Sequence, residues 1–232
     1  QYYAELGQNQ ALYAKYKALR ASTEFEKLSA TRKKIIENEL RDFRLSGAEL
    51  EEDKKARFLE IQEEMSSLCS RFSDNLLDAT NDYTHVVEDS AELSGLPDDD
   101  VQAAADAAQV AGKSGWVFTL KAPSYMAVMQ YADNRMLREK IYEAYGKRAS
   151  EFGKAEWDNT ALISQILKLR AEEAQLLGYV NYAELSLASK MANTPQQILH
   201  FLRELAQRAR TFAEKDLAEL REFARTKLGL AD

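Results

Sequence analysis

The sequence predicts a mainly α-helical fold, a multi-helix lobe of long amphipathic helices that carries a small two-strand β element. Apolar residues recur at alternating spacings of three and four over long stretches, a pattern typical of amphipathic helices. Only nine Gly and three Pro occur in 232 residues, so few positions interrupt a helix. β-branched and aromatic runs mark one interval, at about residues 83–121. We therefore expect residues 1–232 to form a single helical lobe.

Two helices are expected before residue 50. The first runs from about Glu5 to Arg20 and has an apolar face. Ser29 is placed to cap the second, which continues to about Leu45 and stops at Ser46-Gly47.

A long helix is expected next, over about Glu51–Asp82, because its apolar stripe holds one face for many turns. The single cysteine, Cys69, falls mid-helix beside this stripe. That position supplies no neighbouring histidine to activate a thiol, so we expect a packing residue rather than a nucleophile. The stripe consists of Phe58, Ile61, Met65, Leu68, Phe72, Leu76, Ala79 and Tyr83.

The helical pattern then breaks. Thr84–Val87 and Trp116–Leu120 have the composition of two short strands, which we expect to pair as a ribbon supported by the helices. Between them, Pro97 and the aspartates after it start an alanine-rich helix that Gly112 ends. Gly112-Lys113-Ser114 lacks the earlier glycine of a phosphate-binding loop and precedes a strand, which indicates a polar turn.

Helices resume at about Ser124 and again over Asn134–Arg148. Either Asp158 or Asn159 caps a further helix, which Gly178 terminates. A capping box with proline at the first helical position, Thr194-Pro195-Gln196-Gln197, starts a final helix that runs to about Lys227. We expect its apolar residues to face inward: Ile198, Leu202, Leu205, Ala209, Phe212, Leu220 and Ala224.

Composition excludes several functional classes. The net charge is −7 and Lys and Arg are scattered among acidic residues, so no surface for nucleic acid or an anionic membrane is predicted. No apolar stretch approaches the roughly 20 residues that span a bilayer. The start, at Gln1, is typical of neither a signal peptide nor a natural initiator, so we expect a cut amino end. A single cysteine favours the reducing cytoplasm.

The histidines do not form a zinc-binding sequence. A catalytic zinc takes three protein ligands, and two histidines on one helix face need i, i+4 spacing. His85 and His200 are more than a hundred positions apart, and although His200 and Glu204 share a helix face, one His and one Glu make a weak pair. We therefore assign no catalytic residue, no metal ligand and no cofactor to this chain.

Tyrosines and arginines gather on the two helices expected after residue 122. Helical spacing alone produces such clusters, with the hydroxyls reaching water. In the alternative interpretation, these side chains line a groove that handles extended peptide. The candidate substrate-channel residues are Tyr125, Tyr131, Arg135, Tyr142 and Tyr145, with Arg138 and Arg148 nearby.

Four sequence phrases carry a resemblance to a known family. They are ENELRDFRLSGAEL (Glu37–Leu50), ELSGLPDD (Glu92–Asp99), PSYMAVMQYADNRMLREKIYEAYGKRAS (Pro123–Ser150) and DNTALISQILKLRAEEAQLLGYVNYAELSLASKMANTP (Asp158–Pro195). In this order they resemble the amino-terminal part of the thimet-oligopeptidase family of zinc metallopeptidases, and most of all its bacterial oligopeptidases. The resemblance covers essentially the whole chain.

The resemblance implies a parent protein that hydrolyses short peptides in a deep channel, with zinc held by a His-Glu-x-x-His helix and a further Glu. This chain would be its non-catalytic amino-terminal lobe and inactive alone. Its expected partners are the carboxyl-terminal catalytic lobe of the same parent chain, short peptides in the parent, and further copies of itself. The alternative is a free-standing helical adaptor with no link to proteolysis, because long amphipathic helices serve both.

Overall fold

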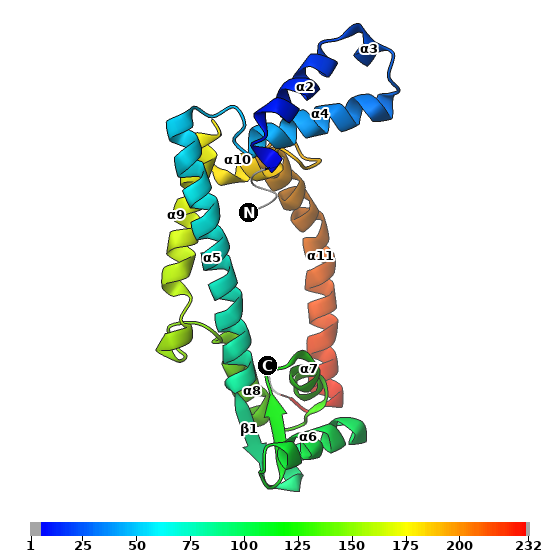
Figure 1. Ribbon diagram of the computed structural model, residues 1–232. Coiled ribbons are helices and arrows are strands. Elements are labelled where there is room, and N and C mark those ends of the chain that lie inside the picture. Colours follow the sequence, from blue (N-terminus) through cyan, green and yellow to red (C-terminus); the bar gives the residue numbers. More distant parts are fainter. Residues whose placement is uncertain (1–5, 231–232) are drawn as a thin grey trace. The chain divides into compact units, whose positions relative to one another are not determined.

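Helices make up most of the protein in the computed structural model, which describes residues 6–230 (Figure 1). The mainly α-helical prediction is confirmed, with long helices and one antiparallel pair of strands. The chain divides into two compact units. The first takes in residues up to Leu59 and from Arg170 onward, and the second is Glu60–Leu169. The single lobe expected from the sequence stays a prediction.

A helical hairpin opens the first unit. Its two long helices, α2 (Gln10–Arg20) and α4 (Ala30–Leu45), pack against each other. The buried rings of Tyr13 and Phe43 meet between them, with centroids 5.3 Å apart, and buried Ala48 completes this small core. The face predicted for this helix, Leu12, Tyr16 and Leu19, is half-buried, and Leu12 and Tyr16 pack against this core, whose buried α2 residue is Tyr13.

Side-chain caps set the ends of these helices. Asn9 Oδ1 accepts a hydrogen bond of 3.0 Å from a first-turn amide of α2. The expected start at Glu5 lies outside the described residues. Ser29 caps α4, as predicted. Ser22 caps α3 (Thr23–Glu26), a four-residue helix that the sequence pattern did not predict.

Two helices belong to both units. α5 (Glu52–Asp82) begins in the first unit and continues in the second, and α9 (Thr160–Leu176) runs from the second into the first. Within the first unit, the Arg57 guanidinium of α5 donates two hydrogen bonds to the Glu172 carboxylate of α9, at 2.6 and 2.8 Å. Cys69 on α5 is half-buried, which agrees with a packing role.

The first unit ends with α10 (Tyr182–Leu187), which was not predicted, and α11 (Pro195–Lys227). The predicted cap of α11 is present, since Thr194 Oγ1 accepts from the Gln197 amide at 3.1 Å. The return bond differs from a standard capping box: Gln197 Oε1 accepts from the amide of Asn193, at 2.9 Å, rather than from that of Thr194.

The second unit contains the predicted ribbon. β1 (Thr84–Val87) pairs antiparallel with β2 (Trp116–Thr119), with Val87 opposite Trp116. Between the strands, α6 (Asp98–Val110) packs on β2 through buried alanines. Gly112 follows α6 with a φ of +64° and leads toward β2, so the predicted polar turn is confirmed.

Two further helices complete this unit, α7 (Ala122–Tyr131) and α8 (Arg135–Gly146). They pack against each other, and α7 also contacts β2. The unit's core combines strand, turn and helix residues, and its most deeply buried members include Val87, Phe118, Leu120, Val128 and Ile141.

The start of α9 resolves the two capping alternatives. Asp158 Oδ1 accepts a hydrogen bond of 2.8 Å from the amide of Thr160, the first residue of α9, so Asp158 supplies the capping side chain. The Asn159 side chain instead points into the unit, where it donates to the carbonyl of Phe72 at 3.0 Å and bonds to Asn75.

Candidate functional site

The structure brings together two of the five predicted channel residues. The rings of Tyr125 on α7 and Tyr145 on α8 stack with centroids 3.9 Å apart and planes 22° apart. The guanidinium carbon of Arg148 lies 3.5 Å from the centroid of the Tyr145 ring. Stacking of this kind orients aromatic faces and contributes about 0.5–1.5 kcal/mol.

The other three candidates lie on the same helices but outside the stack. Tyr131, at the end of α7, is 50% exposed, and Tyr142 on α8 is 61% exposed. Arg135, the first residue of α8, is also exposed. These side chains are available to solvent, but none of the three stacks with the Tyr125–Tyr145 pair.

The two neighbouring arginines have structural partners. Arg138 donates to the carbonyls of Ala132 and Asp133, where α7 ends. Arg148 donates to the carbonyl of Tyr145 at 2.9 Å and to the Thr80 hydroxyl at 3.0 Å. These bonds hold Arg148 over the ring of Tyr145.

Beside this stack is a cavity of about 400 Å3 that mixes aromatic and cationic walls. Lys154 lies over the Trp157 ring at 4.6 Å and pairs with Asp82 at 2.7 Å. Phe152, 71% exposed, has the Lys147 ammonium 5.8 Å from its ring centroid. Aromatic faces and cations of this kind can hold apolar side chains and carboxylates of a peptide.

Sequence reasoning did not identify Phe152, Lys154 and Trp157 as part of this surface. Their signal was the alternation of aromatic and basic residues in the loop before α9. That loop lacks the helical periodicity on which the predicted cluster depends. The loop residues join the Arg148 region only through the fold of the second unit.

The histidines lie apart from this cavity. Burial lowers the pKa of His85 on β1, nearby Lys140 lowers it further, and Glu92 opposes both. The His200 side chain on α11 is 84% exposed, with Nε2 at 3.9 Å from a carboxylate oxygen of Glu204. Within residues 6–230, no three His, Cys, Asp or Glu side chains are arranged to hold a metal ion. The described residues therefore do not fit the zinc that the resemblance implies.

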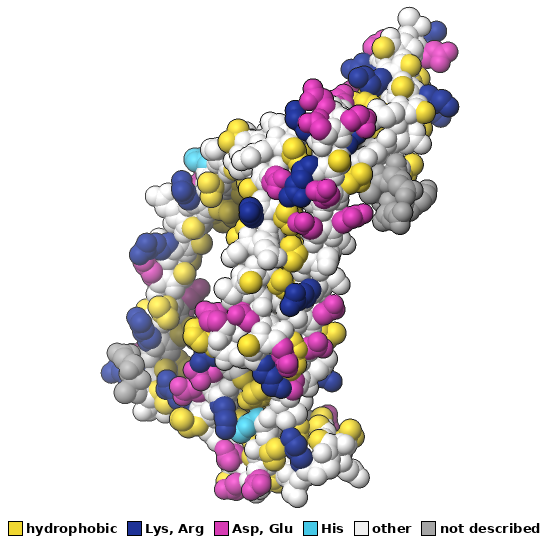
Figure 2. Space-filling view, turned by 60° about the vertical axis from the view of Figure 1, so that its left-hand side comes forward, with side chains coloured by type: hydrophobic (Ala, Val, Ile, Leu, Met, Phe, Trp, Pro, Cys, Tyr) yellow, Lys and Arg dark blue, Asp and Glu magenta, His cyan; other side chains and the backbone are white. Residues whose placement is uncertain are grey.

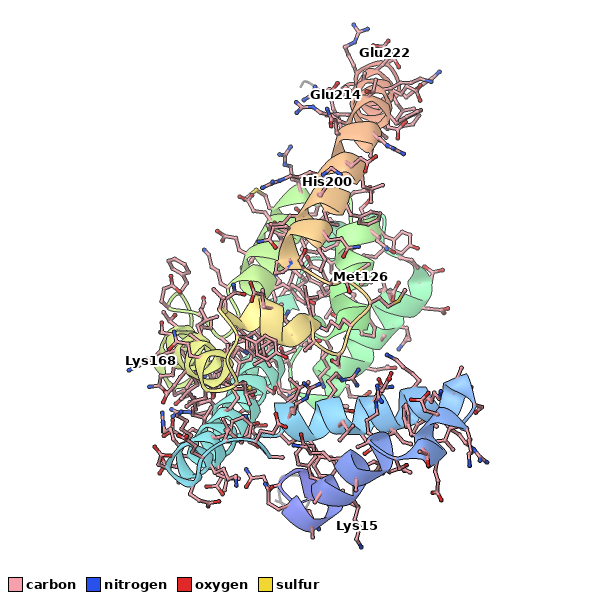
Figure 3. The ribbon with its side chains drawn as sticks, turned by 90° about the horizontal axis from the view of Figure 1, so that it is seen from above. Lys15, Met126, Lys168, His200, Glu214 and Glu222 are labelled. Carbon is pink, nitrogen blue, oxygen red and sulfur yellow. The ribbon has the colours of Figure 1, made fainter. Side chains whose placement is uncertain are left out.

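The prediction that the apolar face of α11 points inward is wrong. No α11 residue is buried. Figure 3 shows how the helix extends from His200 past Glu214 to Glu222. We call four of its apolar residues, all predicted to face inward and all more than half exposed, the α11 stripe: Leu202, Leu205, Phe212 and Leu220.

Charge is mixed over the surface. On the face shown in Figure 2, Lys and Arg side chains are interspersed with Asp and Glu. No described helix is long and apolar enough to cross a membrane.

Comparison with known proteins gives two family matches along the chain. Residues 1–55 match the neurolysin/thimet oligopeptidase amino-terminal domain, and residues 128–232 match peptidase family M3. The chain is related to the oligopeptidases of family M3. The family expectation drawn from the sequence phrases is thus confirmed.

Three relatives define the extent of this similarity. Oligopeptidase A of Haemophilus influenzae is 48% identical over 234 residues, which cover 100% of this chain and 34% of the relative. Oligopeptidase A of Escherichia coli is 46% identical, over 99% of this chain and 34% of the relative. A probable cytosolic oligopeptidase A of Arabidopsis thaliana is 42% identical, over 96% of this chain and 32% of the relative. The chain therefore spans about one third of the length of these relatives.

Each of the two family matches covers a different part of the features described above. The M3 match includes α8, the loop with Phe152 and Trp157, and α11. The amino-terminal match includes α2 and α4. Tyr125 precedes the M3 match, so the Tyr125–Tyr145 stack joins that region to the segment before it.

Proposed function

We propose that this chain is the non-catalytic amino-terminal part of a zinc-dependent oligopeptidase that hydrolyses short peptides in a deep channel. The observation that carries the proposal is similarity along 99–100% of this chain to only 34% of bacterial oligopeptidase A. The zinc ligands and the general base would then lie in the remaining part of the parent. In this proposal the chain alone is inactive.

The α11 stripe supports a partner within the parent. Four large apolar side chains on one exposed helix face are unfavourable in water, and such patches commonly mark a contact surface. Contacts between domains of one chain bury about 600–1,500 Å2. We infer that the catalytic part of the parent covers this stripe.

The Tyr125–Tyr145 stack and the cavity beside it are the proposed peptide-contacting surface. Its rings and its cations offer contacts to peptide side chains of different kinds. Tyr131, Arg135 and Tyr142 extend the proposal along α7 and α8 as exposed contacts. The single cysteine, and a relative described as probably cytosolic, support a cytoplasmic location.

One experiment separates this proposal from the adaptor alternative. The chain and the remaining part of its parent are expressed separately, and each is assayed for zinc content and for hydrolysis of an internally quenched peptide. We expect no stoichiometric zinc and no turnover for the chain alone. We also expect chelator-sensitive turnover from the intact parent and association of the two parts when mixed. Chelator-sensitive hydrolysis by the chain alone contradicts its assignment as non-catalytic. A chain that neither binds the other part nor affects its activity favours the adaptor.

A further inference from the structure

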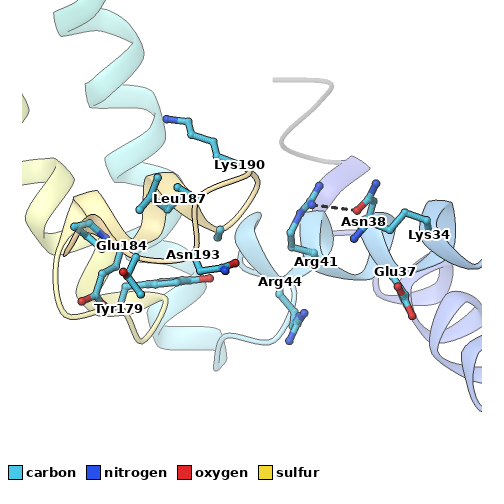
Figure 4. Close-up of a pocket in the computed structure, with 14 residues that line it drawn as sticks. Lys34, Glu37, Asn38, Arg41, Arg44, Tyr179, Glu184, Leu187, Lys190 and Asn193 are labelled. Carbon is cyan, nitrogen blue, oxygen red and sulfur yellow. Dashed lines mark hydrogen bonds between the residues drawn. The ribbon is translucent and has the colours of Figure 1, made fainter. Parts of the chain in front are cut away.

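A polar groove of about 680 Å3 lies in the first unit, between α4 and residues 179–195 (Figure 4). Three cations on α4 line it, Lys34, Arg41 and Arg44, and Lys190 joins them from the segment after α10. The spacing of the α4 residues places all three on one helix face. Four cations thus share one groove in a chain whose net charge is −7.

Two carboxylates also line the groove, Glu37 and Glu184, and neither makes an ion pair within 4.0 Å with these four cations. Glu37 lies 3.8 Å from Arg20, which is outside the groove. Arg41 pairs with Asp42, and its Nη1 donates to Asn38.

Three cations remain without a carboxylate partner among the described residues. The Lys190 ammonium donates to a neutral hydroxyl, that of Ser186, at 2.7 Å. No carboxylate of the described chain lies within 4.0 Å of the charged groups of Lys34, Arg44 or Lys190. An anion bound among them would form charge-assisted hydrogen bonds without displacing an existing ion pair.

The wall opposite α4 is held in place by the backbone. Gly178 has a φ of +82°, and the Tyr179 amide donates to the carbonyl of Ala174 at 2.8 Å, which fixes Tyr179 at the end of α9. In Figure 4 the Tyr179 side chain points from there toward α4. The amide of Asn193 is held by Gln197, and its side chain lines the groove. These two polar side chains can bond to the backbone of an extended ligand.

The groove is longer than a single ion requires. A second cavity of about 410 Å3 shares Arg41, Arg44 and Tyr179 with the first and continues past them to Leu50 and Leu177. Apolar residues such as Leu187 and Pro195 line part of the first cavity. Cations, backbone-binding groups and apolar surface in one continuous groove are the features that recognise a peptide bearing carboxylates.

We propose that this groove binds an acidic peptide segment, with its carboxylates at Lys34, Arg44 and Lys190 and its backbone at Tyr179 and Asn193. The inference does not depend on the proposed function, because it concerns binding by this chain itself.

The test is fluorescence anisotropy of the chain with a labelled eight-residue peptide of alternating Glu and Ala. The same peptide with Gln in place of Glu measures the contribution of the side-chain carboxylates. A carboxyl-terminal amide measures that of the terminal carboxylate. We expect the Glu peptide to bind at least about tenfold more tightly than the Gln peptide, since hydrogen bonds to charged groups are the stronger ones. We also expect the affinity to weaken with salt.

Charge-matched variants locate the site. Arg44→Gln and Lys190→Gln should each weaken binding of the Glu peptide by about fivefold or more. Lys15→Gln removes the same charge from exposed α2, outside the groove, and should change it by less than about twofold. All three variants should have the same circular dichroism spectrum and thermal midpoint as the unsubstituted chain.

Three outcomes would overturn the proposal. One is equal binding of the Glu and Gln peptides, and another is an equal loss of affinity in Lys15→Gln and Arg44→Gln. The third is displacement of the Glu peptide by inorganic phosphate at the same concentration as the unlabelled peptide, because that indicates a general anion site. The first outcome includes a loss confined to the carboxyl-terminal amide, because the terminal carboxylate and not the acidic side chains would then be the ligand.

Discussion

The side chains of Asn75 and Asn159 form a buried hydrogen bond, from Nδ2 to Oδ1 at 2.9 Å, between residues 84 positions apart. Asn75 is 7% exposed and Asn159 is 2% exposed. Asn159 Nδ2 also donates to the carbonyl of Phe72 on α5. These two bonds join the start of α9 to α5 within the second unit, and buried amides of this kind are costly to leave unpaired.

Asn75→Ala should lower the free energy of unfolding by about 1–3 kcal/mol, because it leaves Asn159 Oδ1 buried without its donor. Urea unfolding followed by circular dichroism measures the change. The matched control is Asn81→Ala, on the same helix but exposed, which should stay within about 0.5 kcal/mol of the parent. Alanine has the higher helix propensity at both positions, so a loss at Asn75 cannot come from propensity, and equal changes in both variants would contradict a contribution from the buried bond.

A second prediction compares two glycines that flank the same turn. Gly115 has a φ of +83°, and a Cβ there would lie 2.2 Å from the carbonyl oxygen of Val87. Gly112 has a φ of +64° but open space around the corresponding position. Alanine at Gly112 therefore carries only the backbone strain, about 1 kcal/mol. Alanine at Gly115 adds a clash with the backbone of β1.

We expect Gly115→Ala to destabilise the protein by at least about 2 kcal/mol more than Gly112→Ala, because a backbone carbonyl cannot move aside without disturbing the ribbon. Differential scanning calorimetry on both variants measures this difference. Similar thermal midpoints would show that the ribbon tolerates a shift at Val87.

A third prediction concerns alkaline pH. Burial, followed by the hydrogen bond to Glu49, raises the pKa of Tyr13 to about 12. The folded chain therefore holds this proton more tightly than the unfolded chain, in which tyrosine titrates near its ordinary pKa of about 10. The stabilisation is complete below about pH 10 and is lost as the pH rises toward 12.

Tyr13→Phe removes the titrating group, so the stability of this variant should fall less than that of the unsubstituted chain between about pH 9 and pH 11. Urea midpoints at both values measure the slope. Tyr142→Phe, which removes a hydroxyl from a side chain that is 61% exposed, is the control and should follow the parent. Parallel slopes for the parent and Tyr13→Phe would contradict the prediction.

Local sequence signals predicted most of the fold. Ser29 was identified as a cap because its hydroxyl can bond the free amides of α4, and Thr84–Val87 as a strand because its residues are largely β-branched. α3 and α10 were missed because four and six residues are too few to establish a helical period. The choice between Asp158 and Asn159 depended on a buried partner on α5, which no local signal contains.

The candidate site could be predicted only in part for the same reason. Spacing placed Tyr125 and Tyr145 on two helices, and the tertiary packing of α7 on α8 brought their rings together. Trp157 and Phe152 joined the neighbouring cavity from a loop. For α11, periodicity correctly indicated an apolar face but carried no information on what covers it.

The last prediction follows from that exposed face. Replacing Phe212 and Leu220 of the α11 stripe by serine should leave the thermal midpoint within about 2 °C of that of the unsubstituted chain, because neither side chain is buried. The same change should reduce self-association of the isolated chain and its binding to the remaining part of the parent, because both would use this apolar surface. Sedimentation velocity over a concentration series measures the first effect, and titration with the separately expressed part measures the second. Gln207→Ser, on the opposite face of α11, is the control and should change neither. The prediction fails if the unsubstituted chain stays monomeric and does not bind the other part, while the double variant melts well below it. That result would mean that the stripe packs within this chain in solution.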